Sequence, residues 1–285
     1  MNKLAVIDVS YLCHRARFTT GALSHEGVRT GVVFGFLRDM KILKDALAVD
    51  TFVFAFDGGG SKRKEINPSY KANRDPGNLT PEERMELDDY HKQVRKLREE
   101  LLPQIGYQNL FHVPGFEGDD IIARVCADES VRGNECIIVS SDHDLFQCLN
   151  DRVSMYNPTS KEQMKILDFV DQYGIAPTLW HQVKAIAGCG SDNVVGVPKV
   201  GEKTAAKYLK GELKPSLVTY RNIEKSEKLI AENKKLVKLP FEGTPHFEVQ
   251  LDKISERGWS EVEASIGLRA SRARAVPVEK AKGFF

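Results

Sequence analysis

The sequence predicts an α/β protein built on a parallel sheet, and three observations lead to that prediction. Apolar runs of strand length recur at residues 3–10, 51–60 and 135–144. Helical patterns separate them, as in GVVFGFLRDMKILKDAL at 31–47. The runs lack apolar–polar alternation, which is typical of strands buried on both faces of a sheet. Alternation of strand and helix favours parallel pairing, because each crossover returns the chain to the same edge.

Composition limits the class of protein without deciding it. The chain has 285 residues, enough for one large domain or two small ones. Its 41 basic and 40 acidic residues leave a net charge of +1, so overall charge neither indicates nor excludes a polyanionic partner. Five scattered cysteines without CxxC spacing argue against a zinc or redox motif. With no leader pattern and no long apolar run, we expect a cytoplasmic protein that does not enter a membrane.

A polar, basic stretch interrupts the pattern after the second strand. Residues 61–75 contain five Lys or Arg and no apolar face. A helix is predicted next, because Thr80 and Glu83 form a capping box and Pro81 occupies the first helical position. Pro103 is expected to stop this helix.

The last third of the chain is predicted to be mostly helical and locally basic. Helical patterns dominate after about residue 176. Residues 199–238 hold eleven Lys or Arg against five Glu. The end, 269–285, is basic and has little periodicity, so it is predicted to be a loose tail.

Each predicted strand ends in an acid. Asp8 closes the first and Asp57 the second, and Asp142 and Asp144 follow the third. In open α/β sheets, sites form beyond the carboxyl ends of the strands, so these side chains are expected at one edge. The turn GFEGDD, which opens the helix before the third strand, adds the acids Glu117, Asp119 and Asp120.

Helix capping alone does not account for this density of charge. One cap needs one or two acids. Two carboxylates ~5 Å apart repel each other by roughly 3 kcal/mol at an effective dielectric of ~20, so a cation would offset the cost. Asp192, in a Gly- and Ser-rich turn, completes the set. Oxygen ligands suit magnesium or manganese better than zinc, and a pair of such ions can clamp a phosphodiester.

The stretch GVPKVGEKT resembles a nucleotide-binding P-loop only superficially. Glu202 splits the required Gly-Lys-Thr run and no strand precedes it. A glycine hairpin that opens a helix offers free N–H groups to an anion, here a nucleic-acid phosphate. The predicted contacts are Gly196, Lys199, Gly201, Lys203, Thr204 and Lys207. An ordinary surface turn with solvated lysines is the alternative.

Six motifs, in order, resemble those of the 5′ nucleases, the family of phage flap endonucleases (5′–3′ exonucleases) and the N-terminal domain of bacterial DNA polymerase I. They are VIDVSYLCHRA, FAFDGGG, SYKANRD, GFEGDDIIA, VSSDHDLFQCL and SDNVVGVPKVGEKTAAKYL, and the likeness runs from about residue 3 to 240. The resemblance implies a PIN-like catalytic domain at 1–176 with a strand-threading helical arch at about 61–102. It further implies a helix–three-turn–helix DNA-binding module within 177–268.

The resemblance also implies roles for individual residues. Lys71 and Arg74, at the base of the arch, would face the reacting phosphate, Tyr70 would stack on a base, and Arg15 matches an arginine that follows the first acid. Cys189 stands where bacterial and phage members often have a further acid, which bears on the affinity for a second ion. The metal ligands implied are Asp8, Asp57, Glu117, Asp119, Asp120, Asp142, Asp144 and Asp192.

The resulting hypothesis is a monomeric, structure-specific 5′ nuclease of DNA replication or repair. It would hydrolyse DNA at 5′ flaps, nicks and free 5′ ends with two Mg²⁺ ions, for which Mn²⁺ can substitute. RNA/DNA hybrids are a further candidate substrate, and K⁺ is a candidate ion at the hairpin. Two alternatives stay open: a PIN-type ribonuclease, which would not need the hairpin and basic extension, and a DNA-structure-binding protein with a vestigial site.

Overall fold

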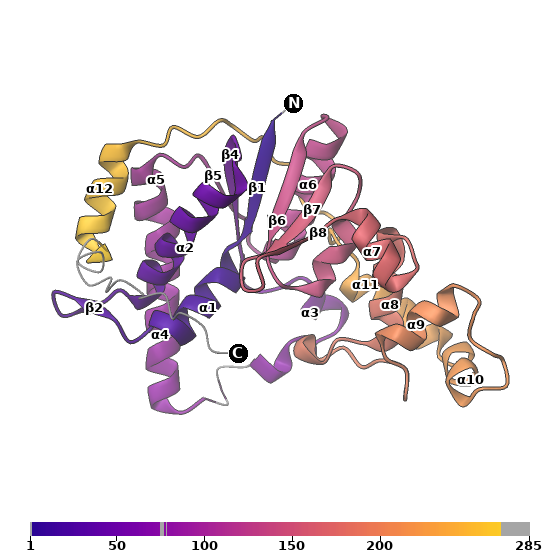
Figure 1. Cartoon of the computed structure of the whole chain (residues 1–285). Coiled ribbons are helices and arrows are strands. Elements are labelled where there is room, and N and C mark those ends of the chain that lie inside the picture. The colour runs from indigo at the N-terminus through magenta and orange to yellow at the C-terminus, as the bar shows by residue number, and fades with distance from the viewer. Residues whose placement is uncertain (1, 75–76, 78, 269–285) are drawn as a thin grey trace, which may run out of the picture.

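The structure, a computed structural model, describes residues 2–74, 77 and 79–268 and has a six-stranded sheet at its centre (Figure 1). The strand order is β5-β4-β1-β6-β7-β8, and every neighbouring pair is parallel except β7 with β8. The predicted parallel α/β fold is therefore confirmed. The strands are β1 (Lys3–Asp8), β4 (Thr51–Phe56), β5 (Asn109–His112), β6 (Glu135–Val139), β7 (Val153–Asn157) and β8 (Glu162–Met164).

Two helices of the N-terminal half cover one face of the sheet. They are α1 (Val9–Thr20) and α2 (Gly31–Leu47), joined by the short hairpin β2 (Ser24–His25) and β3 (Val28–Arg29). The apolar side chains of both helices pack with alternate residues of β1 and β4, and Ile7, Phe36 and Phe54 are fully buried there. The bounds of α2 are those that the sequence pattern predicts.

The opposite face is covered by α6 (Gly118–Val131), the 3₁₀ segment η4 (His143–Cys148), α7 (Ile166–Tyr173) and α8 (Trp180–Ala187). Val6 and Ile138 of the sheet are buried against Ile122 and Trp180 in this second core. Both faces of the central strands are therefore buried. This explains why their sequences show continuous apolar runs instead of alternation.

The basic stretch and the following helix lie beside the carboxyl edge of the sheet. Short helical turns, α3 (Arg63–Ile66) and η1 (Ala72–Arg74), precede the long α4 (Pro81–Lys96). The capping box of Thr80 and Glu83 is present as predicted.

Pro103 does not stop this helix, contrary to the prediction. The chain passes from α4 through a π-helical turn, η3 (Leu97–Leu101), into α5 (Leu102–Ile105). Pro103 follows directly after the π-helical turn, whose shifted hydrogen-bond pattern accommodates a residue without an N–H. The helix ends instead at Gly106, whose positive φ of 109° is readily adopted only by glycine.

The chain after residue 176 is mostly helical up to Val237. After η5 (Pro177–Leu179) and η6 (Gly190–Asp192), the helices α9 (Glu202–Leu209), α10 (Val218–Glu224) and α11 (Glu227–Val237) form the predicted helical region. In Figure 1, α9 and α10 project at one end of the molecule. An extended segment, 239–254, then runs back past β5, where Asn109 Nδ2 donates to the carbonyl of Gln250 at 2.8 Å.

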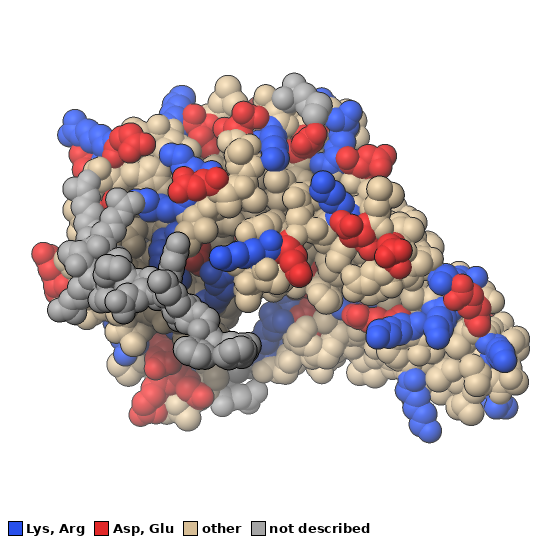
Figure 2. All heavy atoms as spheres, in the orientation of Figure 1, with Lys and Arg blue, Asp and Glu red and all other residues tan. Residues whose placement is uncertain are grey.

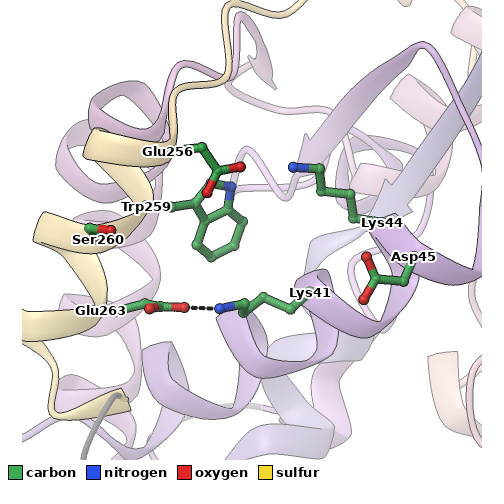
Figure 3. A pocket seen from close by; sticks show the side chains of 7 residues that line it. All are labelled: Lys41, Lys44, Asp45, Glu256, Trp259, Ser260 and Glu263. Carbon is green, nitrogen blue, oxygen red and sulfur yellow. Dashed lines mark hydrogen bonds and ion pairs between the residues drawn. The ribbon is translucent and has the colours of Figure 1, made fainter.

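The last helix, α12 (Glu256–Ser265), belongs to the body of the N-terminal unit and not to the helical region. Trp259 and Val262 are buried in the core formed with α2 and α5. Figure 3 shows α12 facing α2 across a pocket, with an ion pair between Lys41 and Glu263. The predicted tail, 269–285, lies outside the described residues. Within the described part of the chain, no helix has both the length and the apolarity needed to cross a bilayer.

Candidate metal and phosphate site

The carboxyl ends of three adjacent strands bring acids together, as predicted. Asp8 ends β1, and its Oδ1 caps α1 by accepting the Tyr11 N–H at 2.9 Å, while its Oδ2 accepts the Ser140 hydroxyl at 2.7 Å. Asp57 follows β4 and accepts the Ser10 hydroxyl at 2.5 Å and the Gly118 N–H at 2.7 Å. Strand ends and helix starts therefore hold these carboxylates in fixed positions.

Burial and mutual repulsion disfavour the ionised form of several acids at this edge. Burial raises the pKa of Asp8 to about 7, and the charges of Asp57 and Asp142 add to that effect. Burial also raises the pKa of Asp119 well above its usual value, with Asp142 and Asp8 as the main charged contributors. A buried group of carboxylates of this kind is stabilised by a bound cation. The donors are oxygens, so the site fits a hard divalent ion.

A second cluster lies next to the first. Ligand atoms of Asp144, Cys189 and Asp192 lie within 4.8 Å of one another. Burial raises the pKa of Asp144, and Asp142 adds to the shift, whereas Lys184 opposes it. Burial likewise raises the pKa of the Cys189 thiol, with Asp144 contributing. The carboxylates of this cluster are therefore those of Asp144 and Asp192 alone, and Cys189 adds a thiol.

The basic residues of SYKANRD converge on the same acids. Lys71 Nζ is 2.8 Å from Glu117 Oε2 and 3.8 Å from Asp192 Oδ1. Arg74 Nη2 is 2.7 Å from Asp192 Oδ1. Burial works to raise the pKa of Glu117, but the charges of Lys71 and Arg63 outweigh it and the net pKa is lowered. Two cations therefore already contact these acids in the structure.

Asp120, which the sequence predicts as a metal ligand, lies in different surroundings from the other acids. Its side chain is fully buried and forms a two-pronged ion pair with Arg63, with both N···O distances 2.7 Å. It also accepts the N–H groups of Glu117 at 3.0 Å and Phe241 at 2.8 Å. Glu117 and Asp120 form a capping box at the start of α6. Capping thus accounts for this member of the acidic turn.

We expect Asp120→Asn to destabilise the metal-free protein by about 3 kcal/mol, because the buried Arg63 guanidinium loses its two-pronged carboxylate partner and keeps only the Glu117 carboxylate, at 3.7 Å. Asp119→Asn, one position earlier in the same helix, is the matched control. It should leave stability unchanged or raise it, because burial opposes the ionised form of Asp119. Urea unfolding in the presence of a chelator measures both. An Asp120→Asn variant as stable as the parent would contradict the structural assignment.

Two of the other predicted residues lie in unexpected surroundings. Tyr70 is only 2% exposed, and its hydroxyl donates to Glu117 at 3.0 Å and to Asp192 at 3.2 Å. In this conformation it orients acids and offers no face to a base. Arg15 pairs with Asp39 of α2 at 3.1 Å, so the structure uses it to join α1 to α2. Neither arrangement was indicated by the sequence, because both depend on distant partners.

The glycine hairpin joins α8 to α9. At Gly196 its backbone lies close against the backbone of Ala187. A Cβ on Gly196 would lie 1.9 Å from the Ala187 carbonyl oxygen, so only glycine fits there. Gly201 caps α9 and has open space around it. The side chains of Lys199, Lys203 and Lys207 are exposed. Figure 2 shows Lys and Arg prominent, among some acids, over the projecting end where α9 and α10 lie.

Sequence reasoning missed the buried cation Lys184. It is 8% exposed and lies on α8, with its Nζ 2.7 Å from Asp144 Oδ1 and 2.9 Å from Glu202 Oε1. A single lysine within the apolar run QVKAIAG was the available signal. The hydroxyls of Ser10 and Ser140, which orient Asp57 and Asp8, were missed as well.

The fold is that of the PIN-like α/β nucleases, with acids gathered at the carboxyl edge of a largely parallel sheet. Residues 3–174 match the family described as 5'-3' exonuclease, N-terminal resolvase-like domain. This chain belongs to that family.

Related sequences are found in bacteria. Thermostable DNA polymerase I of Thermus thermophilus is 32% identical over 211 residues, which cover 73% of this chain but only 24% of the polymerase. The chain thus spans about a quarter of the length of that relative. A 5'-3' exonuclease of Buchnera aphidicola is 29% identical over 259 residues, covering 88% of this chain and 85% of the relative.

Solved structures with the same fold are more distant in sequence. The T5 5'-exonuclease with bound zinc has a TM-score of 0.72 at 22% identity, covering 84% of this chain and 90% of that one. Human GEN1 in complex with Holliday junction DNA has a TM-score of 0.59 at 15% identity, covering 93% of this chain and 68% of that one. At these identities the similarity establishes the fold alone.

Proposed function

We propose that the protein is a structure-specific 5′ nuclease that hydrolyses DNA phosphodiester bonds as a flap endonuclease and 5′–3′ exonuclease. The observation that supports this function best is the convergence of two acid clusters with Lys71 and Arg74 at one edge of the sheet. Acids that favour hard cations, with basic groups beside them, suit phosphoryl transfer. Membership of the 5′–3′ exonuclease family supports the same proposal.

Two divalent cations, when bound, would neutralise the scissile phosphate and lower the pKa of the attacking water. The oxygen donors favour Mg²⁺, with Mn²⁺ able to substitute. Lys71 and Arg74 would orient the phosphate and stabilise the charge that builds on its oxygens. Ser10 and Ser140 would keep Asp57 and Asp8 in place by donating their hydroxyl protons. The proposed ligands are Asp8, Asp57, Glu117, Asp119, Asp142, Asp144 and Asp192.

The hairpin and α9 would hold duplex DNA. The exposed Lys199, Lys203 and Lys207 would neutralise backbone phosphates, while the open cap at Gly201 offers free N–H groups. Thr204 is one turn into the same helix and can add a hydroxyl contact. K⁺ bound among the hairpin carbonyls is a further part of this proposal. Because the contacts are to phosphate, binding would be insensitive to sequence and would fall with salt.

The proposed substrates are 5′ flaps, nicks and free 5′ ends of DNA in replication or repair, with RNA/DNA hybrids as a secondary class. The complex of human GEN1 with junction DNA supports a DNA substrate. The hairpin favours DNA over the PIN-type ribonuclease alternative, which has no need of it. The monomeric state and the cytoplasmic location stay predictions.

The test is cleavage of matched 5′-flap, nicked-duplex, single-stranded DNA and single-stranded RNA substrates, with Mg²⁺ and with a chelator. We expect the flap and nicked DNA to be cut only with Mg²⁺ and the RNA to be cut far more slowly. Tight binding of flaps without cleavage would favour the DNA-structure-binding alternative. Preferred cleavage of the RNA would favour the ribonuclease.

A further inference from the structure

A separate pocket lined by arginines and histidines adjoins the acid clusters on the side of β4 and β5. Its volume is about 640 Å³, which lies within the range of small-ligand sites. Its walls come from the start of α1, the end of β4, α4, the π-helical turn and the end of β5. Asp57 forms one wall, so the pocket is continuous with the edge that holds the candidate site. We name it the arginine–histidine pocket after His14, His91, Arg95, Arg98 and His112.

The chemistry of this pocket favours an anion. Arg95 and Arg98 supply two guanidinium groups, whose forked donors match phosphate oxygens. Of the acids in the wall, Glu99 pairs with Arg98 at 2.6 Å, and both oxygens of Asp57 already accept hydrogen bonds. Burial lowers the pKa of His14, His91 and His112, with nearby arginines contributing. Each imidazole offers at least one N–H donor in either protonation state.

The position of the pocket identifies the phosphate that would enter it. A strand whose scissile phosphate lies over the acid clusters places its neighbouring phosphate about one nucleotide away. Asp57 contributes both to the acid edge and to the pocket, so the two phosphates can be held together. Tyr90, whose ring centroid lies 4.9 Å from that of His14 in a tilted arrangement, forms a largely buried aromatic part of the pocket wall.

We propose that the arginine–histidine pocket receives the phosphate next to the scissile one, and that at a nick or recessed end this is the terminal 5′ phosphate. This inference rests on the proposed nuclease function and adds a substrate preference to it. A 5′-phosphorylated end would be bound more tightly than a 5′-hydroxyl end. On an unbroken flap, the same pocket would hold an internal phosphodiester.

The kinetic test compares nicked duplexes that differ only in a 5′ phosphate or a 5′ hydroxyl. For the parent, we expect KM to be about ten-fold lower with the phosphate, the scale of charge-assisted hydrogen bonds. The double variant Arg95→Ala with Arg98→Ala should lose that preference, while Lys92→Ala, an exposed cation of the same helix outside the pocket, should keep it. A 5′-flap duplex is included to show whether the pocket also holds an internal phosphodiester. If it does, the KM for the flap should be higher in the double variant than in the parent.

A binding test keeps the inference independent of activity. Thymidine 5′-monophosphate is titrated into the chelator-treated protein while the imidazole proton resonances are followed, with thymidine as the control ligand. We expect the monophosphate, and not the nucleoside, to shift resonances of His14, His91 and His112 in the parent and in Lys92→Ala but not in the double variant.

Failure of the inference is distinguishable from failure of the proposed function. Equal KM values for the two ends, or identical titrations with nucleotide and nucleoside, would overturn the pocket assignment even if flaps are cut. A parent that cuts no substrate but still binds the monophosphate through Arg95 and Arg98 would refute the nuclease and leave a phosphate-binding pocket.

Discussion

Asp144→Ala should bind a 5′-flap substrate almost as tightly as the parent and cleave it about 1,000-fold more slowly or worse. Asp144 contributes to the second acid cluster with Asp192, where Cys189 supplies no third carboxylate. Removing one of two carboxylates from a proposed cation site should therefore abolish its occupancy at ordinary Mg²⁺ concentrations. Duplex affinity should persist, because it would come from the hairpin lysines. Single-turnover cleavage and equilibrium binding in Ca²⁺ measure the two properties separately.

Asp151→Ala is the matched control, since Asp151 is an exposed acid in the turn before β7, at the opposite edge of the sheet from the acid clusters. It should change neither rate nor affinity. Asp144→Ala removes one of the two ion-pair partners of Lys184. The Lys184 Nζ keeps its contact with Glu202 at 2.9 Å, so the fold should survive. Near-normal Mg²⁺-dependent cleavage by Asp144→Ala would remove the second cluster from the mechanism.

Lys71→Ala should lower the single-turnover rate by about 100- to 1,000-fold and change the dissociation constant only a few-fold. In the free protein the Lys71 ammonium already contacts Glu117 and Asp192. The backbone N–H of Lys71 donates to the backbone carbonyl of Asp192 at 2.9 Å. Binding a substrate phosphate exchanges one anionic partner for another, which adds little affinity. The gain comes when charge accumulates on the phosphoryl oxygens, where a positioned ammonium is most effective.

Lys64→Ala is the matched control for this prediction, because Lys64 is an exposed cation in the neighbouring turn α3. If Lys71 were only one of many solvated cations, both variants would weaken binding several-fold and leave the single-turnover rate nearly intact. Lys71→Arg adds a second comparison, since it keeps the charge but alters the geometry. Its rate should lie between those of the parent and the alanine variant.

The sequence was sufficient for the three central strands β1, β4 and β6, their parallel direction and the edge at which their acids lie, but not for β5, β7 and β8 or for the strand order. Buried strands and amphipathic helices have periodicities that are visible locally, and the position of an acid at a strand end follows from the strand itself. The capping box of Thr80 and Glu83 and the bounds of α2 were predictable for the same reason. Each of these features depends on residues a few positions apart.

The π-helical turn is a feature that helix-stop signals in the local sequence do not predict. Pro103 is a strong stop signal, yet an extra residue in η3 shifts the hydrogen-bond pattern so that the helix continues to Ile105. The start of α2 gives a similar case. Its N-terminal N–H group at Val32 is capped by Gln93 Oε1 of α4 at 2.9 Å, and Thr30 makes no side-chain cap. No local pattern could identify a cap supplied from another helix.

Sequence alone thus determined which residue types gather at the site, and tertiary structure decided what each one does there. Asp119 and Asp120 are adjacent and chemically identical, but Asp120 meets Arg63 and the Phe241 N–H while Asp119 remains with the acid cluster. Tyr70 and Lys184 are given partners by segments far away in the chain, as is Trp259 of α12. The physical reason is that strand and helix periodicity is set by neighbours, whereas ion pairs, burial and the resulting pKa shifts depend on which distant segments pack together.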